Sequence, residues 1–245
     1  MAEKIGIIIP ARSKSTRFPN KPMADICGQT MISRVWENAC RDLNIEDVWV
    51  ATDSQEIKAE IEARGGNALI VDSECLTGTD RVAEANKILG YDIVINIQGD
   101  EPLLESSILD LALEAFKKSN ADAINCMAPI QSINDFKNTN IPKVITDDRD
   151  YLIYISRSPI PLNKEKITDI SNAYRQVCTY VFSKKALEFY GENKTKCHLE
   201  SIEDIEILRL IENHLTVKMI RVESKSIAVD TPDDLQRVIS FLNQD

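Results

Sequence analysis

"IIIPARSKSTRFPNKP", residues Ile7 to Pro22, joins an apolar run directly to a cationic loop. The run Ile5–Ile9 predicts a buried β-strand. The loop contains four cations, Arg12, Lys14, Arg17 and Lys21, although the chain as a whole has a formal net charge of −10. In an open α/β sheet, ligands bind beyond the carboxyl ends of the strands. We therefore expect this loop to bind an anion against the overall charge balance.

Apolar runs alternate with helical patterns through the first half of the chain. Further strands are expected at Asp47–Asp53, Ala68–Val71, Asp92–Pro102 and Ala121–Cys126, and helices at Met31–Arg41, Gln55–Ala63, Thr79–Leu89 and Ser107–Lys118. The apolar runs are too continuous for a sheet with one wet face. The alternation therefore predicts an α/β fold with a mostly parallel sheet that is flanked by helices on both sides.

The second half of the chain is less regular. Residues 134–143 have a linker-like composition, strands are expected near Val144–Ile145, Leu152–Ser156, Val177–Phe182 and Thr216–Arg221, and a final helix is expected at Pro232–Leu242. We expect a single domain, residues 1–245. Within it, approximately residues 135–215 are expected to form an insertion that covers the carboxyl edge of the sheet.

Composition excludes several classes of protein. Hydrophobic residues make up 43% and charged residues 28% of the 245 residues, which is typical of a soluble globular protein. No apolar run approaches the roughly 20 residues of a membrane span, and the amino terminus does not resemble a signal peptide. The six cysteines form no C-x-x-C pair, which favours free thiols in a reducing cytoplasm. Two histidines exclude a multi-histidine metal site, and the acidic balance argues against nucleic acid as a partner.

The cationic loop has the chemistry of an oligophosphate site. Arg12 and Arg17 can each bind two phosphate oxygens, and Lys21 supplies a compact charge. The chain has neither G-x-x-x-x-G-K-[ST] nor G-x-G-x-x-G, so the loop is not a Walker-type or dinucleotide-binding loop. A solvated surface loop is the alternative interpretation.

Acidic residues follow three more of the expected strands: Asp53, then Asp100 with Glu101, then Asp230. A parallel sheet brings such strand ends toward one edge, and carboxylates beside phosphates suit Mg²⁺. Each acid also has a structural interpretation, since Asp53 could cap the helix near Gln55 and the residues after Asp230 form a good helix start. Asp100 is the strongest candidate, because the preceding glycine lets the backbone approach a ligand closely.

Several motifs occur in a family-specific order: "IPARSKSTRFPNKPMADICGQTMI", "ATDS", "TGTDR", "NIQGDEPLL", "YISRSPIP" and "VDTPDDL". Between Ile5 and Leu235 the chain resembles the CMP-Kdo synthetases, the 3-deoxy-manno-octulosonate cytidylyltransferases of Gram-negative lipopolysaccharide and capsule synthesis. The resemblance implies a nucleotidyltransferase-type fold with a dimerisation arm, and hence a homodimer. It also implies that a Kdo-type sugar attacks the α-phosphorus of CTP with the help of Mg²⁺, giving CMP-sugar and pyrophosphate.

The resemblance also assigns roles to residues. It implies that Arg12, Lys21 and Asp100 are catalytic and that Asp100 and Asp230 bind the metal. The nucleotide-binding residues it implies are Arg12, Arg17, Lys21, Thr77, Gly78, Thr79, Asp80 and Arg81. Those implied for the sugar are Gln98, Arg157 and Tyr180, and Gln176 is expected in the same pocket, at a position where the family has another residue.

The chain departs from the family pattern around the expected sugar pocket. "RQVCTY" (Arg175–Tyr180) stands where the family has R-H-x-G-x-Y, so Gln176 replaces a histidine and Cys178 a glycine. Ile207 stands where glutamine is usual, and the "SIAVD" before Thr231 lacks the usual glycines. These departures favour an altered sugar such as 8-amino-3,8-dideoxy-manno-octulosonate. Neutral drift within an ordinary Kdo enzyme is the alternative.

An acidic cluster lies near the same pocket. Glu200, Glu203 and Glu206, with Asp204 between them, are expected on one broad face of a helix because they are three residues apart. If Glu203 and Glu206 border the sugar, they would attract an amino group. If they do not, the face is simply solvated.

Two other functions remain open. One is a cytidylyltransferase for a different acid sugar, such as a nonulosonate. The other is a catalytically dead nucleotide-binding protein, against which the intact Arg12, Lys21, Asp100 and Asp230 argue.

Overall fold

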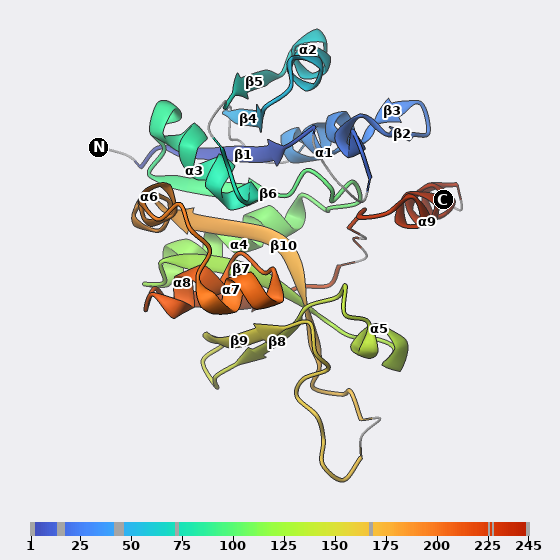
Figure 1. Cartoon of the computed structure of the whole chain (residues 1–245), viewed down its shortest axis with the longest axis vertical. Helices are drawn as coiled ribbons and strands as arrows, with labels where there is room; N and C mark the ends of the chain where they lie inside the picture. The colour runs from blue at the N-terminus through green and yellow to red at the C-terminus, as the bar shows by residue number, and fades with distance from the viewer. Residues whose placement is uncertain are drawn as a thin grey trace.

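The computed structural model describes residues 3–13, 18–41, 47–71, 74–166, 169–224, 226 and 228–243. Its core is a nine-stranded sheet (Figure 1). The strands of this sheet are β1 (Ile5–Ala11), β4 (Val48–Thr52), β5 (Asn67–Ile70), β6 (Ile93–Ile97), β7 (Ala123–Pro129), β8 (Lys143–Thr146), β9 (Leu152–Ser156), β10 (Tyr174–Ser183) and β11 (Val217–Arg221). A small hairpin joins β2 (Asp25–Ile26) to β3 (Gln29–Thr30).

The described helices are the short 3-10 helix η1 (Lys21–Met23), α1 (Met31–Cys40), α2 (Gln55–Ala63), α3 (Gly78–Leu89), α4 (Ser107–Lys118), α5 (Ile133–Lys137), α6 (Lys184–Glu192), α7 (His198–Glu203), α8 (Leu208–Glu212) and α9 (Pro232–Leu242). None of these helices is both long and apolar enough to cross a membrane.

The sheet is mixed and mostly parallel. Its main path runs β11-β7-β10-β6-β1-β4-β5. Strands β6, β1, β4 and β5 pair in parallel, as do β11 and β7, whereas β10 is antiparallel to β6, β7 and β8. The α/β class and the helical flanks agree with the expectation from the sequence.

Both faces of the sheet are buried, and the first strand shows why its sequence is apolar throughout. Ile7 and Ile9 pack in the core formed with α1, α2 and α4, whereas Ile8 packs on the opposite face with α3, α6 and α8. All three isoleucines are fully buried. Successive side chains of a strand point to opposite faces, so a strand with two covered faces needs apolar residues at every position.

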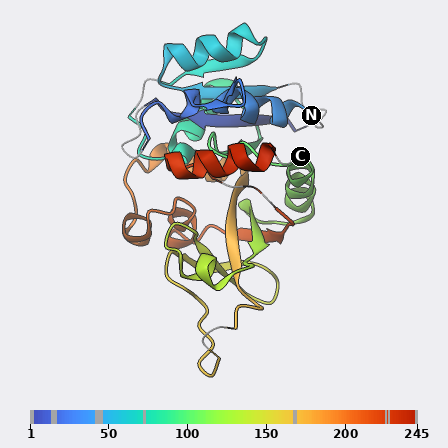
Figure 2. The same ribbon diagram turned by 90° about the vertical axis from the view of Figure 1, so that its right-hand side faces the viewer.

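Strand ends meet at one edge of the sheet, because β1, β4 and β6 are parallel and nearly in register. The chain returns to this edge near its carboxyl terminus, where the backbone N–H of Val229 donates to the carbonyl of Asp100. Helix α9 follows and packs on the β2–β3 hairpin. Figure 2 looks onto this edge, with α9 in red across the front.

Two features of the second half differ from the sequence expectation. The linker-like residues 134–143 include most of the short helix α5, which begins with the side chain of Ser132 as its cap. Strand β10 lies inside the expected insertion but forms the middle of the main sheet. The hairpin β8–β9 and the segment that connects it to β10 project away from the other layers (Figure 1). The single domain with its insertion stays a prediction.

Candidate active site

A large cleft opens at the carboxyl edge of the sheet, with a volume of about 950 Å³. Most of the residues singled out in the sequence line it: Arg12, Lys21, Thr77, Gly78, Arg81, Gln98, Asp100, Arg157, Gln176, Tyr180, Glu206 and Asp230. Thr79, Asp80 and Glu203 are described but do not line this cleft. Arg17 lies outside the described residues. The fold therefore gathers residues from near both ends of the chain, from Arg12 to Asp230.

Lys21 forms the centre of the cleft's charge arrangement. Its Nζ lies 2.7 Å from Asp100 Oδ2 and 3.3 Å from Asp230 Oδ1, and it donates a 2.7 Å hydrogen bond to the carbonyl of Val229. The preceding Asn20 has a left-handed backbone, which turns the chain into η1 and directs Lys21 inward. Burial acts to lower the pKa of Lys21, but the two carboxylates outweigh it and raise that pKa. The ammonium is therefore charged when it meets a ligand.

The two carboxylates fit a magnesium ion. The side chains of Asp100 and Asp230 are 26% and 35% exposed, so both carboxylates remain accessible from the cleft. In the described part of the chain, no group of three or more His, Cys, Asp or Glu residues forms a ready metal cage. Mg²⁺ commonly takes one or two carboxylates and completes its coordination with substrate oxygens and water. Asp100 and Asp230 are such a partial donor set.

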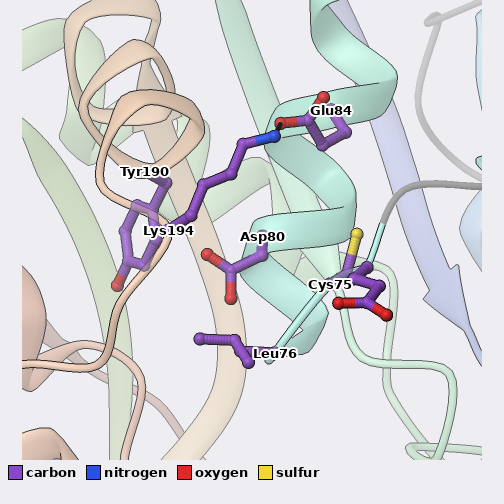
Figure 3. Close-up of a pocket in the computed structure, with 7 residues that line it drawn as sticks. Cys75, Leu76, Asp80, Glu84, Tyr190 and Lys194 are labelled. Carbon is purple, nitrogen blue, oxygen red and sulfur yellow. Dashed lines mark ion pairs between the residues drawn. The ribbon is translucent and has the colours of Figure 1, made fainter.

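The start of α3 forms another wall of the cleft. Thr77 caps the helix by accepting from the N–H of Asp80, and the Asp80 carboxylate accepts from the N–H and hydroxyl of Thr77. Asp80 also lies 2.6 Å from the buried guanidinium of Arg209. Figure 3 shows Asp80 beside Tyr190 and Lys194, in a separate small pocket. The expectation that Asp80 lines the nucleotide cleft is therefore corrected. Asp80 does not line the cleft, and its carboxylate binds Thr77 and Arg209 instead.

Glu206 occupies the amino terminus of α3. Its carboxylate accepts from the N–H groups of Gly78 and Thr79, at 3.0 and 2.9 Å, and from the Thr79 hydroxyl at 2.5 Å. Burial raises the pKa of Glu206, although these donors oppose the shift. The first N–H groups of a helix commonly bind an anion, and here a side chain of the protein fills that place. Sugar binding by Glu206 stays a prediction, and the carboxylate has three partners already.

Asp53 ties the first loop to α3. Its carboxylate accepts from the N–H of Ser13 at 2.9 Å and lies 3.3 Å from Arg81 Nη2. Arg81 also donates to the carbonyl of Val71. Asp53 does not cap α2, because Ser54 does so. Asp53 therefore positions two walls of the cleft relative to each other.

Gln176 and Tyr180 lie on either side of an irregularity in β10, where the pairing with β7 shifts register. Asn125 fills this bulge and donates to the carbonyls of Val177 and Thr179, at 2.8 Å each. Gln176 Nε2 donates to Asn125 Oδ1 and to the hydroxyl of Tyr180, at 2.9 and 3.1 Å. Both amide hydrogens of Gln176 are thus engaged, and no described residue donates to its Oε1. Gln176 can offer that acceptor to a ligand in the cleft.

Glu203 and Arg157 form hydrogen bonds with each other and with neighbouring residues. Glu203 accepts from the Ser156 hydroxyl at 2.6 Å and from the N–H of Arg157 at 2.9 Å. The Arg157 guanidinium donates to three backbone carbonyls, those of Thr139, Glu203 and Asp204. Burial acts to raise the pKa of Glu203, but its hydrogen-bond donors outweigh burial and lower that pKa. The expected sugar contact of Glu203 is not supported by its position, since the carboxylate fixes the end of β9 outside the cleft.

The prediction that the acidic residues share one face of a helix is wrong. Helix α7 ends at Glu203, Asp204 has a left-handed backbone with φ of 51°, and α8 begins only at Leu208. Glu200 is fully buried and lies 2.6 Å from the guanidinium of Arg209. A spacing of three places residues on one face only while the helix continues.

Sequence reasoning missed the role of Glu101. Its side chain lines the cleft, is only 3% exposed and accepts a hydrogen bond from the Ser226 hydroxyl. Burial raises the pKa of Glu101 to about 7, against the effect of the Ser226 hydrogen bond. The signal available in the sequence was a second acid directly after Asp100, at a strand end.

Comparison with known proteins shows one consistent relationship. The family model described as "Cytidylyltransferase" matches residues 6–222. A 3-deoxy-manno-octulosonate cytidylyltransferase from Geotalea uraniireducens is 36% identical over 98% of this chain and 100% of its own length. One of the same name from Thermodesulfovibrio yellowstonii is 40% identical over 96% and 97%. A solved CMP:2-keto-3-deoxy-manno-octonic acid synthetase, complexed with CTP, superimposes with a TM-score of 0.90 at 30% identity and covers 98% of this chain and 99% of its own.

Proposed function

Because the chain belongs to the cytidylyltransferase family, we propose that its cleft transfers CMP from CTP to a 3-deoxy-manno-octulosonate-type sugar acid. The proposed products are the CMP-sugar and pyrophosphate, and the CMP-sugar would supply lipopolysaccharide synthesis. The observation that carries this proposal is the placement of Lys21 between Asp100 and Asp230, within a cleft that Arg12 also lines. Since CTP is made and used in the cytoplasm, we place the reaction there.

The reaction needs charge neutralisation and alignment more than it needs a covalent intermediate. The anomeric hydroxyl of the sugar attacks the α-phosphorus of CTP, the bond from this phosphorus to the bridging oxygen of pyrophosphate breaks, and the hydroxyl proton is lost. Positioning and electrostatic stabilisation supply most of the catalysis in such transfers. Arg12 and Lys21 would offset the negative charge that builds up on the departing pyrophosphate.

Asp100 and Asp230 would hold a magnesium ion in this reaction, since they form a partial set of oxygen ligands beside Lys21. When bound, such an ion polarises phosphate oxygens and lowers the pKa of a coordinated hydroxyl. The walls formed by Thr77, Gly78 and Arg81 would bind the nucleotide. Gln98, which lies directly beside Gly78, would contact the sugar.

Within this function we propose that the sugar is the 8-amino analogue rather than Kdo itself. The supporting observation is Gln176, which is neutral and whose amide hydrogens already bind Asn125 and Tyr180. Unlike a histidine, Gln176 cannot become a cation that repels an ammonium group, and the atom it offers to the cleft is a carbonyl oxygen that can accept from such a group. Glu203 and Glu206 add little to this argument, because both carboxylates have partners elsewhere.

One assay tests the reaction and the sugar together. Pyrophosphate release is measured with CTP and Mg²⁺ against Kdo, 8-amino-Kdo and a nonulosonate. We expect kcat/KM for 8-amino-Kdo to exceed that for Kdo by about 10²-fold, the scale on which a buried polar site rejects a mismatched substrate. Equal kcat/KM values for the two sugars, or a preference for Kdo, would show that Gln176 is a neutral substitution. A preference for the nonulosonate would reassign the enzyme, and release with none of the three sugars would contradict the proposed function.

We also propose that the chain forms a homodimer through β9 and the segment after it. Among described strands, β9 pairs only with β8, so its other edge is open. Ile153 on this strand is 57% exposed, and Leu162 in the projecting segment is 56% exposed. Open strand edges and exposed apolar side chains are features of protein interfaces.

A further inference from the structure

The described residues 222–224, 226 and 228–230 belong to the stretch that leads from the end of β11 to Asp230 in the cleft. We call it the return segment. Its first residue is held by the sheet, because the N–H of Val222 donates to the carbonyl of Met127. At its end, Val229 donates to the carbonyl of Asp100 and accepts from Lys21. The position of Asp230 relative to Asp100 therefore depends on how this segment is held between its two ends.

One buried pair holds the described middle of the return segment. The hydroxyl of Ser226 donates to the carboxylate of Glu101, and these residues are only 6% and 3% exposed. The N–H of Ser226 donates to the hydroxyl oxygen of Ser224 at 3.1 Å. Glu101 directly follows Asp100 in the chain, so the pair joins the return segment to the turn that carries the other candidate metal ligand.

Arg175 holds the same part of the segment from the other side. Its Nη2 donates to the carbonyls of Ser224 and Ser226, at 2.9 and 3.4 Å. Arg175 lies near the start of β10, where this strand pairs with β7 and β8, and it also lines the cleft. The carbonyls of Ser224 and Ser226 are thus bound to a residue of β10, and the side chain of Ser226 is bound to the turn after β6.

From this arrangement we propose that Glu101 and Ser226 form a clasp that positions Asp230 opposite Asp100. The clasp sets the affinity of the cleft for a divalent cation bound together with CTP. Neither residue needs to touch a substrate, so both are positioning residues. The proposal rests on the proposed function for its choice of ligand. The clasp itself is a property of the protein without ligands.

The first test measures the segment in the protein alone. Amide hydrogen exchange is followed in the peptide that covers the return segment, in the unmodified protein and in Ser226→Ala. Loss of one buried hydrogen bond corresponds to roughly a tenfold change in a local opening equilibrium. We therefore expect exchange in this peptide to be about tenfold faster in the variant, with exchange in β1 and β6 unchanged. Unchanged exchange in the return segment would overturn the clasp.

The second test measures metal binding without relying on turnover. Binding of Mn²⁺ in the presence of CTP is titrated calorimetrically, and we expect Ser226→Ala to weaken it by about tenfold, on the scale of one hydrogen bond. Ser226→Thr keeps the hydroxyl and should restore both the affinity and the slow exchange. Faster exchange with unchanged Mn²⁺ affinity would overturn the positioning role.

A matched control is available in α1 and α2. Ser33 is also fully buried and also donates to a glutamate, Glu60, at 2.7 Å. Ser33→Ala should lower the melting temperature without changing Mn²⁺ affinity or exchange in the return segment. An equal loss of affinity in Ser33→Ala would mean that general destabilisation explains the result and would overturn the proposal. Pyrophosphate release by the unmodified protein tests the proposed function separately.

Discussion

Lys21 is the residue on which the electrostatics of the cleft depend. It holds the carboxylates of Asp100 and Asp230 close together, which two like charges would otherwise oppose. The same ammonium can meet the phosphates of a nucleotide. The free protein therefore keeps its candidate metal ligands in place by an internal cation.

Replacing Lys21 tests this double role. We expect Lys21→Ala to remain folded and to lower kcat/KM for CTP by about 10- to 150-fold, which corresponds to about 1.5–3 kcal/mol for a charge-assisted contact. Lys58→Ala is a suitable control, because Lys58 lies away from the cleft and pairs with Glu62 on the surface of α2. Steady-state kinetics with CTP as the varied substrate gives the answer, and normal kinetics in folded Lys21→Ala would contradict the assignment.

Asp100→Asn and Asp230→Asn keep the shape of each side chain and remove its charge. If the two residues bind Mg²⁺, each substitution should lower kcat by roughly 10²-fold or more, the scale of losing one electrostatic stabiliser of a transition state. Asp110→Asn, on the exposed surface of α4, should change little. The rates are compared over a range of Mg²⁺ concentrations. Turnover that persists in EDTA would refute the metal assignment.

Glu203 predicts a pH dependence of stability. Its pKa is lowered in the folded protein, against the effect of burial, by the donors Arg157, Ser156 and Tyr154. The stabilisation it provides is therefore fully present above its unfolded pKa near 4.5 and is lost as the pH falls through the lower folded value. Denaturant unfolding of Glu203→Gln should show the largest deficit in unfolding free energy at neutral pH, and the deficit should shrink in acid. A deficit that is independent of pH would contradict this origin.

At the scale of elements, the turn after β6 and the end of β1 lie so close that a side chain would not fit between them. A Cβ atom added at Gly99 would lie 2.7 Å from the backbone oxygen of Pro10. The sequence suggested that this glycine allows close approach to a ligand. The structure shows that the close approach is to the neighbouring strand end.

Gly99→Ala should therefore destabilise the protein by about 1–3 kcal/mol, the usual cost of overpacking. The shift in melting temperature should be roughly 2–4 °C for each kcal/mol in a chain of this size. Gly78→Ala is the matched comparison, because its added Cβ would meet the flexible end of Gln98, at 2.8 Å. Calorimetry should show a smaller loss for Gly78→Ala. A larger loss for Gly78→Ala than for Gly99→Ala would contradict this interpretation.

Elements with local signals could be predicted from the sequence, and those that depend on distant contacts could not. Helices α2 and α9 begin after Ser54 and Thr231, whose side chains cap them, and both match the expected ranges. The direction of β10 has no local signal, because a buried apolar run reads the same in either orientation. The end of α7 before Asp204 was likewise not predicted, because glutamates three residues apart suggested one continuous helix.

At the scale of the whole molecule, the proposed dimer should depend on the open edge of β9. Ile153→Lys introduces a charge on this edge and should shift the protein from dimer to monomer in light scattering at micromolar concentration. Ile88→Lys is the control, since Ile88 is 68% exposed but lies on α3. A monomeric unmodified protein, or a dimer that is insensitive to Ile153→Lys and still sensitive to Ile88→Lys, would contradict the proposed interface.

The sequence predicted which residues line the cleft better than it predicted the hydrogen bonds and ion pairs among them. Lys21, Asp100 and Asp230 each lie near a strand end or a helix start, so a parallel sheet was expected to bring them to one edge. Their pairing distances could not be predicted, because they depend on the return segment and on η1. Glu101 was missed for the same reason, since its partner lies 125 residues away in the chain.

The place of β10 also has a consequence for how the protein is made. Strands β6 and β7 are both complete by Pro129, yet they are joined in the sheet only by β10, which begins at Tyr174. A nascent chain that has emerged only to residue 173 has two buried-type strands with unpaired edges, and such edges template misassembly. We expect synthesis and refolding to be most vulnerable to aggregation in this interval, and fragments that stop short of Ser183 to need a chaperone to stay in solution. The chain can therefore become a stable protein only after β10, the strand between the two halves of the sheet, has been synthesised.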